Sequence, residues 1–192
     1  MRIWIFCSNF VRRNELKKMQ VIYFAGGCFW GTEHFFQQIQ GVVRTETGFA
    51  NGREDLPEPT YEQVYTDSTG YAETVLVEFD EAEVSLDFLV RLFFRAIDPL
   101  SLNKQGEDEG TRYRTGVYYV SQAQKTVIEA VFAQEQKKYK EPIQVELLPL
   151  KNYYPADEYH QNYLVKHPDG YCHLPIALFR WAKEQKMGTE IK

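Results

Sequence analysis

Hydrophobic positions recur along the chain with two different periods, which predicts strands interleaved with helices. Short runs that are rich in β-branched and aromatic residues predict strands. Apolar residues three or four positions apart predict helices that bury one face. The strands are expected at 20–25, 42–50, 71–79, 115–120 and 143–149. The helices are expected at 28–39, 84–97, 122–140 and 155–167, with loops at 51–60 and 100–114.

Residues at the ends of these segments support three of the predicted helices. Ser121 and Gln124 have the spacing of a capping box at the start of the third helix. Pro155 stands in the expected first turn of the last helix, a position that proline favours. The second helix is expected to end at Asp98 and Pro99, because the residue before a proline disfavours helical geometry.

The element order is β-α-β-β-α-β-α-β-α, with no internal repeat and no low-complexity linker. This order predicts one α+β domain, a two-layer sandwich of the ferredoxin-like type in which helices pack on a small mixed or antiparallel sheet. Met19 directly precedes the first predicted strand. We therefore expect a single domain over 19–192, and we expect residues 1–18 to be a dispensable N-terminal extension.

Composition and charge narrow the class of protein. The chain has 192 residues, of which 44% are hydrophobic and 26% charged, as is usual for one globular domain. The net charge is −5 and no basic cluster occurs, so a nucleic-acid partner is not expected. No stretch reaches the roughly 20 apolar residues that span a membrane, and the start lacks the order of a secretory signal. We expect a cytoplasmic protein without a membrane partner.

Three cysteines, Cys7, Cys28 and Cys172, occur without a CxxC pair, so a structural zinc site is not expected. Cys28 follows two glycines in "GGCFWG", at the expected junction between the first strand and the first helix. A helix N-terminus supplies partial positive charge and free N–H groups, which lower the pKa of a thiol. Cys28 is therefore predicted to be a reactive nucleophile, and the alternative is a small buried residue at a turn.

Other candidate side chains leave two interpretations open at this point. Phe29 and Trp30 would line an apolar pocket beside the sulfur or simply fill the core. Glu73 would be a general acid if it faced inward, because burial raises the pKa of a carboxyl group. The alternating pattern of its strand favours an outward position instead. Tyr61 and Tyr113 would orient a polar substrate oxygen or be loop aromatics.

The four histidines, His34, His160, His167 and His173, show no zinc-ligand spacing. His160 and Asp157 lie on the last predicted helix and would suit a Cys–His site. A packing role for His160 is favoured.

"GGCFWG" at 26–31 strongly resembles the active-site motif of the A-type peptide methionine sulfoxide reductases. Four further segments follow in the order of that family, and the resemblance covers roughly residues 20–172. They are "PTYEQV" (59–64), "TGYAETVLVEFD" (69–80), "QGEDEGTRYRTGVY" (105–118) and "YYPADEYHQNYLVKHPDGYC" (153–172).

The resemblance implies a reaction and a role for each candidate side chain. Cys28 would attack the sulfur of methionine-S-sulfoxide, and Glu73 would protonate the sulfoxide oxygen. The remaining roles are implied in the same way: Tyr61 and Tyr113 would hydrogen-bond that oxygen, Phe29 and Trp30 would hold the substrate's methyl group, and Asp108 would lie near the substrate.

Recycling is also implied by the resemblance. Cys28 would be left as a sulfenic acid, which Cys172 would condense to a disulfide. A thioredoxin-like reductant would reopen that disulfide, and no metal or organic cofactor would be needed. The segment after Cys172, "CHLPIALFRWAKEQK", differs from the glycine-rich stretch of some family members and has no later cysteine. Cys7 lies outside the resemblance and has no assigned role.

Two other functions compete with this interpretation. One is a different thiol enzyme, a peroxidase or an acyl transferase, which would need His160 or His34 near Cys28. The other is a non-catalytic module that binds oxidised methionine in partner proteins and makes no methionine.

Overall fold

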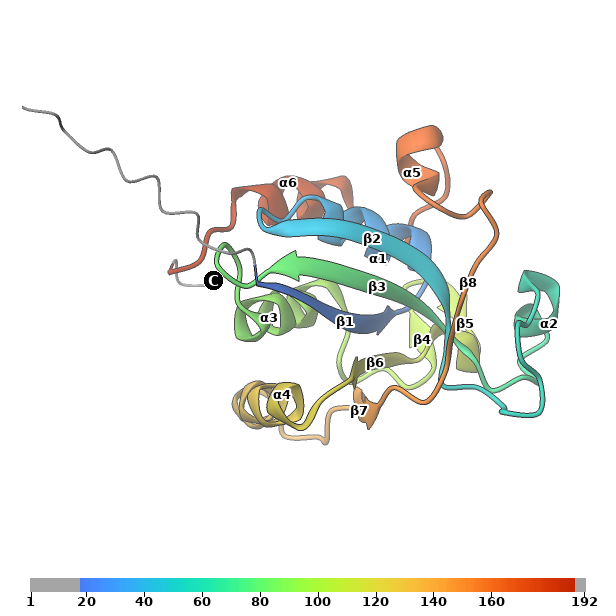
Figure 1. The fold of residues 1–192 in the computed structure, drawn as a ribbon, viewed down its shortest axis with the longest axis horizontal. Helices are drawn as coiled ribbons and strands as arrows, with labels where there is room; N and C mark the ends of the chain where they lie inside the picture. Colours follow the sequence, from blue (N-terminus) through green and yellow to red (C-terminus); the bar gives the residue numbers. More distant parts are fainter. Residues whose placement is uncertain (1–17, 189–192) are drawn as a thin grey trace, which may run out of the picture.

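A six-stranded sheet forms the centre of the computed structural model, which describes residues 18–188 (Figure 1). The strand order is β7-β6-β1-β3-β2-β8. The parallel pair β6–β7 stands beside antiparallel pairs, so the sheet is mixed. The strands are β1 (Met19–Gly26), β2 (Val42–Ala50), β3 (Ala72–Asp80), β6 (Thr115–Tyr119), β7 (Glu146–Pro149) and β8 (Tyr153–Pro155). A separate hairpin pairs β4 (Lys104–Gln105) with β5 (Asp108–Glu109).

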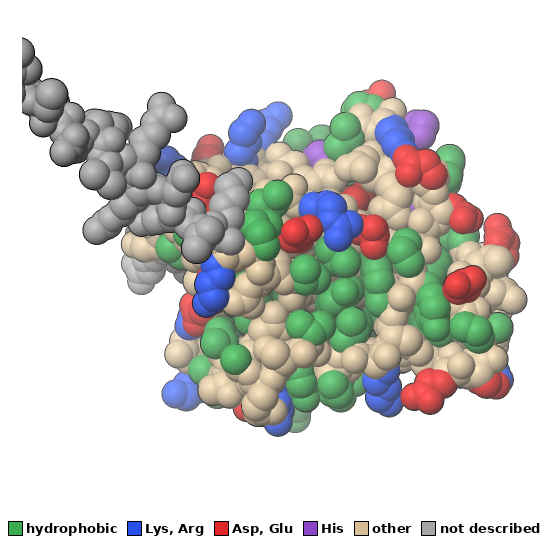
Figure 2. Space-filling model, viewed as in Figure 1, with side chains coloured by type: hydrophobic (Ala, Val, Ile, Leu, Met, Phe, Trp, Pro, Cys, Tyr) green, Lys and Arg blue, Asp and Glu red, His purple; other side chains and the backbone are tan. Residues whose placement is uncertain are grey.

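Helices cover one face of this sheet, and their apolar sides form the main core (Figure 1). Phe24 of β1 stacks on Phe36 with ring centroids 4.4 Å apart, and Phe93 lies 5.0 Å from Phe24. The helices are α1 (Phe29–Gln37), α2 (Tyr61–Tyr65), α3 (Leu86–Ala96), α4 (Gln122–Gln136), α5 (Tyr163–Lys166) and α6 (Ile176–Glu184). A 3-10 turn, η1, spans Thr111–Tyr113. Figure 2 shows hydrophobic side chains gathered over the strands on the viewed face. A small second cluster of buried residues consists of Ala25, Ala50, Ala72 and Tyr118.

Most of the predicted elements are confirmed, with ends shifted by a few residues. The first four strands, the first helix and the loop at 51–60 lie where the pattern places them. Helix α3 ends before Asp98 and Pro99, as predicted. Ser121 caps α4 by accepting a hydrogen bond from the Gln124 N–H, but the Gln124 side chain accepts from Val120 N–H rather than from Ser121.

The helix predicted at 155–167 is wrong in its first half. Pro155 ends the edge strand β8 and lies opposite Gly48 of β2. An edge strand can contain proline, because proline has no N–H to donate and one side of an edge strand has no neighbouring strand to accept it. The Gln161 side chain accepts from Thr47 N–H and donates to Thr47 O, which holds this segment against β2. Only Tyr163–Lys166 is helical.

Three further predictions need correction. Helix α4 ends at Gln136, not at 140, because the Gln136 side chain accepts from Ile143 N–H and donates to Glu141 O, which folds the chain back. The last predicted strand corresponds to β7, which begins at Glu146 and not at 143. The loop predicted at 100–114 contains β4, β5 and η1. Helices α2 and α6 were not predicted.

Two sequence expectations lie outside the described residues. Cys7 and nearly all of the proposed extension fall within 1–17, which the structure does not describe. Among residues 18–188, no helix combines the length and the apolar character needed to cross a membrane.

Candidate active site

Cys28 lies at the point where β1 turns into α1. Gly27 before it has φ +83°, a backbone conformation that a residue with a side chain rarely adopts. Cys28 itself is the N-cap of α1 and is only 5% exposed. The Thr32 hydroxyl lies 3.2 Å from both Gly26 O and Cys28 O and fixes the turn from inside. The predicted position of the thiol at a helix N-terminus is confirmed.

Burial, and not the helix N-terminus, decides the net pKa of the Cys28 thiol. The backbone N–H groups of Trp30 and Gly31 do lower the pKa of Cys28. Burial raises it more, and the carboxyl group of Glu73 adds to the rise. The net pKa is well above the ordinary value, so Cys28 is a protonated thiol at neutral pH.

Glu73 of β3 lies beside Cys28 and is 1% exposed. Its Oε2 accepts a hydrogen bond of 2.9 Å from Phe29 N–H, in the first turn of α1. Burial raises the pKa of Glu73 to about 8, although the Phe29 N–H and the Arg112 charge both act to lower it. The outward position that the alternating pattern favours is wrong, because β3 is a central strand and nearly all of its residues are buried.

Tyr61 and Tyr113 approach the same site from α2 and η1. Burial and the nearby carboxyl group of Glu73 raise the pKa of each phenol, and Cys28 contributes to both. Both hydroxyls therefore stay protonated. Arg112 lies over the Tyr113 ring at 4.4 Å and pairs with Asp67 at 2.7 Å, which fixes the η1 turn.

Phe29 and Trp30 lie differently around Cys28. Phe29 is 1% exposed and packs against Phe49 and Tyr61, with centroids 5.8 and 6.3 Å away, so it belongs to the core as well as to the site. Trp30 is half-buried and stacks on Tyr163 at 3.7 Å.

His160 is a packing residue in this structure. Its Nδ1 accepts a hydrogen bond of 3.2 Å from Trp30 Nε1, and its ring stacks on Tyr61 at 4.5 Å. It orients two aromatic rings of the site.

A different histidine, His173, lies near Cys28. The Cys28 sulfur, a carboxylate oxygen of Asp108 and a ring nitrogen of His173 all lie within 4.8 Å of one another. The sequence prediction of Asp108 at the site is consistent with this placement. No sequence signal pointed to His173, since no spacing rule connects a residue 145 positions away to the thiol.

Cys172 lies against the first turn of α1 and is partly exposed. A side chain at Gly31 would begin 3.1 Å from the Cys172 sulfur and 3.0 Å from Cε1 of His173, so even an alanine there would be crowded by both side chains. The Leu174 N–H donates to the Cys172 sulfur at 3.4 Å. Both Cys28 and Cys172 are free thiols.

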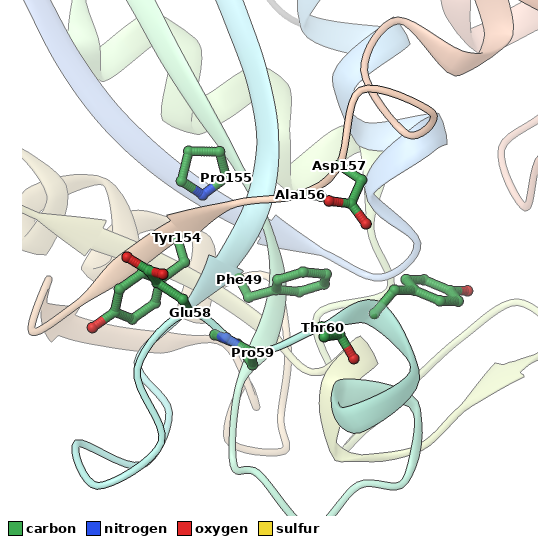
Figure 3. Close-up of a pocket in the computed structure, with 9 residues that line it drawn as sticks. Phe49, Glu58, Pro59, Thr60, Tyr154, Pro155, Ala156 and Asp157 are labelled. Atoms are coloured by element: carbon green, nitrogen blue, oxygen red, sulfur yellow. The ribbon is translucent and has the colours of Figure 1, made fainter.

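Two cavities border these residues. One, of about 370 Å³, lies between the start of α2 and β8 and includes Tyr61; Figure 3 shows Phe49 and Pro59 in its wall and Glu58 and Asp157 at its sides. The other is a groove of about 880 Å³ along α1, α5 and α6, lined in part by Cys172 and Phe179. The two cysteines thus differ in access: Cys28 is buried, whereas Cys172 opens on a groove.

A buried thiol beside a protonated carboxyl group is the arrangement of a thiol-dependent enzyme, and comparison with known proteins specifies which kind. Residues 20–191 match the family model described as peptide methionine sulfoxide reductase. The chain belongs to this family.

Individual members of the family are similar to this chain in sequence and in structure. The peptide methionine sulfoxide reductase MsrA of Clostridium acetobutylicum is 52% identical over 162 residues, which is 84% of this chain and 99% of the relative. The reduced form of Mxr1 from Saccharomyces cerevisiae has a similar structure, with a TM-score of 0.77 and 37% identity over 83% of this chain and 91% of that one. A structure of Mxr1 in complex with Trx2 matches with a TM-score of 0.54 and 26% identity, over 81% and 91% of the two chains.

Proposed function

We propose that this protein reduces methionine-S-sulfoxide to methionine in oxidised proteins, and so repairs them. One observation carries the proposal: a nucleophilic thiol, Cys28, and a carboxyl group that keeps its proton, Glu73, lie in one buried site. Membership of the family supports the same reaction.

The protons and electrons of the first step balance within these two residues. Glu73 donates its proton to the sulfoxide oxygen while the Cys28 sulfur attacks the substrate sulfur. The thiol proton of Cys28 then replaces the one that Glu73 gave. The protonated oxygen then passes to the Cys28 sulfur: a sulfur–oxygen bond forms on Cys28, while the substrate's sulfur–oxygen bond and the temporary bond between the two sulfur atoms break. Methionine leaves, and Cys28 is a sulfenic acid. Cys28 is oxidised by two electrons and the sulfoxide is reduced by two.

The other site residues position the substrate in this proposal. Tyr61 and Tyr113 donate hydrogen bonds to the sulfoxide oxygen, since both phenols stay protonated. Phe29 and Trp30 hold the methyl group on their apolar faces. Asp108 lies at the edge of the site and faces the polar part of the substrate.

Recycling uses Cys172. It condenses with the Cys28 sulfenic acid to form a disulfide and water, and a thioredoxin-like protein reopens that disulfide by thiol exchange. The structure of the yeast relative in complex with Trx2 supports a reductant of this class. Cys172 lies against the first turn of α1 and lines an open groove, and this placement is consistent with both steps.

Four wider expectations belong to the same proposal. The fold is of the ferredoxin-like type, and the support is the strand order β6-β1-β3-β2 with antiparallel neighbours. Residues 19–192 form a single catalytic domain. The reaction needs no metal or organic cofactor. The protein acts in the cytoplasm.

The test uses the two separated sulfoxide epimers of a blocked methionine, with dithiothreitol as reductant. We expect the wild type to reduce the S epimer only and Cys28→Ser to reduce neither. Failure of folded, reduced protein to reduce either epimer would contradict the proposal. Hydrogen peroxide and an activated ester, tested in parallel, would reveal a different thiol enzyme. Binding of the sulfoxide without turnover would indicate a non-catalytic module.

A further inference from the structure

Three buried polar atoms beside the two thiols have no hydrogen-bond partner among the described residues. They are Nδ1 and Nε2 of His173 and Oδ2 of Asp108. The His173 side chain is only 2% exposed, and its Nδ1 lies 4.0 Å from Asp108 Oδ2, which is too far for a hydrogen bond. Buried polar groups are nearly always paired, but here, within the described part of the chain, only the backbone of Gly26 interacts with the imidazole, without ideal hydrogen-bond geometry, so this poorly paired ring needs an explanation.

The position of His173 relates it to both sulfur atoms. One of its ring nitrogens lies within 4.8 Å of the Cys28 sulfur. Its Nδ1 and the Cys172 sulfur each lie 3.1 Å from the point at which a side chain on Gly31 would begin. The imidazole therefore lies next to the Cys28 sulfur and on the same side of Gly31 as the Cys172 sulfur.

We propose that His173 carries the proton of the recycling step, taking it from the Cys172 thiol and returning it to the hydroxide that leaves the Cys28 sulfenic acid. This inference rests on the proposed function and deepens it. The Cys172 thiolate attacks the Cys28 sulfur, the sulfur–sulfur bond forms and the sulfur–oxygen bond breaks. The hydroxide leaves as water with the proton from His173. Each sulfur changes by one electron in opposite directions, so no other oxidant or reductant is needed.

The acid–base state of each group suits this role. Burial raises the pKa of the Cys172 thiol, so it needs a base to become a nucleophile. Burial lowers the pKa of His173, so the imidazole is neutral and able to accept a proton at neutral pH. The Asp108 carboxyl group raises the pKa of His173 and would stabilise the imidazolium while it carries the proton.

Few titratable groups face this imidazole. They are Cys28 at the start of α1, Asp108 on β5, and Cys172 on the same segment. Tyr171 lies next to Asp108, and the Asp108 charge raises the pKa of the Tyr171 phenol. The backbone of Gly26 also interacts with the imidazole, and Gly27, Gly31 and Gly106 lie next to it; none of these groups titrates.

The test separates the two chemical steps in the absence of a reductant. Reduced protein is mixed with the S epimer and quenched at intervals. Methionine reports the first step, and the loss of alkylatable thiols reports the disulfide. For His173→Gln at pH 7 we expect methionine formation to stay within about threefold of wild type and disulfide formation to slow about 100-fold, the range of general acid–base catalysis. The conservative His173→Asn should behave in the same way.

The pH profile distinguishes a proton carrier from a structural residue. In the wild type, conversion of the sulfenic acid to the disulfide should be flat through neutral pH and fall only below the ordinary imidazole pKa of about 6.5, as His173 becomes protonated. In His173→Gln the same step should rise with pH and approach the wild-type rate only in the alkaline range, where the Cys172 thiol, whose pKa burial raises, ionises without a base. That recovery also shows that the variant is folded. The control is His167→Gln, which changes an exposed histidine and should leave both steps unchanged.

Three results would overturn the inference. Wild-type disulfide formation in His173→Gln at pH 7 would remove His173 from the step. Equal slowing at every pH would make it a structural residue. Equal slowing of methionine formation would assign it to Cys28 instead. A wild type that forms no methionine at all would refute the proposed function itself, which is a separate outcome.

Discussion

Replacing Glu73 by glutamine tests whether this carboxyl group is protonated in the folded protein. Glutamine keeps the shape of the side chain and an oxygen that accepts the hydrogen bond from Phe29 N–H, but it has no proton to titrate. The structure raises the pKa of Glu73 from 4.5 to about 8, chiefly through burial. At about 1.4 kcal/mol for each pH unit, this rise corresponds to about 5 kcal/mol.

The sign of the effect follows from the proton balance. Below pH 4.5, the ordinary pKa, Glu73 is protonated in both the folded and the unfolded chain, and it has no effect on stability. Between 4.5 and about 8, the unfolded chain loses this proton while the folded chain keeps it. The folded state then binds more protons, so its free energy of unfolding falls as the pH rises. Above about 8 the loss is complete.

Glu73→Gln should therefore be as stable as wild type at about pH 5 and up to about 5 kcal/mol more stable at about pH 9. Urea unfolding of both proteins across this range, followed by tryptophan fluorescence, measures the difference. Activity should show the reverse: kcat/KM of wild type should fall above about pH 8, and the variant should lose about 100-fold or more. A stability difference that does not change with pH would refute the reasoning, because Glu73 would then be ionised in the folded protein at neutral pH.

Four further substitutions test other parts of the site. Tyr61→Phe and Tyr113→Phe each remove one proposed donor to the sulfoxide oxygen, so kcat/KM should fall about 10- to 100-fold without a change in thermal stability; unchanged kinetics would exclude that hydroxyl from the reaction. Gly31→Ala places a carbon atom 3.0 Å from His173 Cε1 and 3.1 Å from the Cys172 sulfur. Turnover with thioredoxin should fall about tenfold while one methionine per chain still forms without reductant, and loss of both would mean that the active site itself is displaced. Arg112→Met removes a charge that lowers the pKa of Glu73, so the alkaline fall in kcat/KM should move to higher pH, and a move to lower pH would contradict the assignment.

Local sequence signals were sufficient where they agreed with one another. The strand before Cys28, the glycine at positive φ and the apolar spacing after it all indicate the same strand–turn–helix unit, and the structure has it. Helix α2 was missed although its signal is present. Thr60 and Gln63 have capping-box spacing, and both hydrogen bonds of the box form. The turn residues before it, "LPEP", masked this signal.

Other features depend on contacts between distant segments. Glu73 faces inward because β3 pairs with β1 and β2 on either side, and no property of "GYAETV" alone reports this central position. Pro155 reads as a helix start, but pairing with Gly48 makes it the end of an edge strand. The net pKa of Cys28 depends on how completely the site is buried. His173 reaches Cys28 only after the chain beyond α5 folds back over α1.

The central claim is that the Cys28 sulfur takes the oxygen from methionine-S-sulfoxide. The most direct measurement uses Cys172→Ser, which cannot form the Cys28–Cys172 disulfide, mixed with the S epimer without reductant. The account predicts one methionine per chain and one added oxygen on the peptide that carries Cys28, seen by mass spectrometry. No methionine, or the added oxygen on another residue, would contradict it.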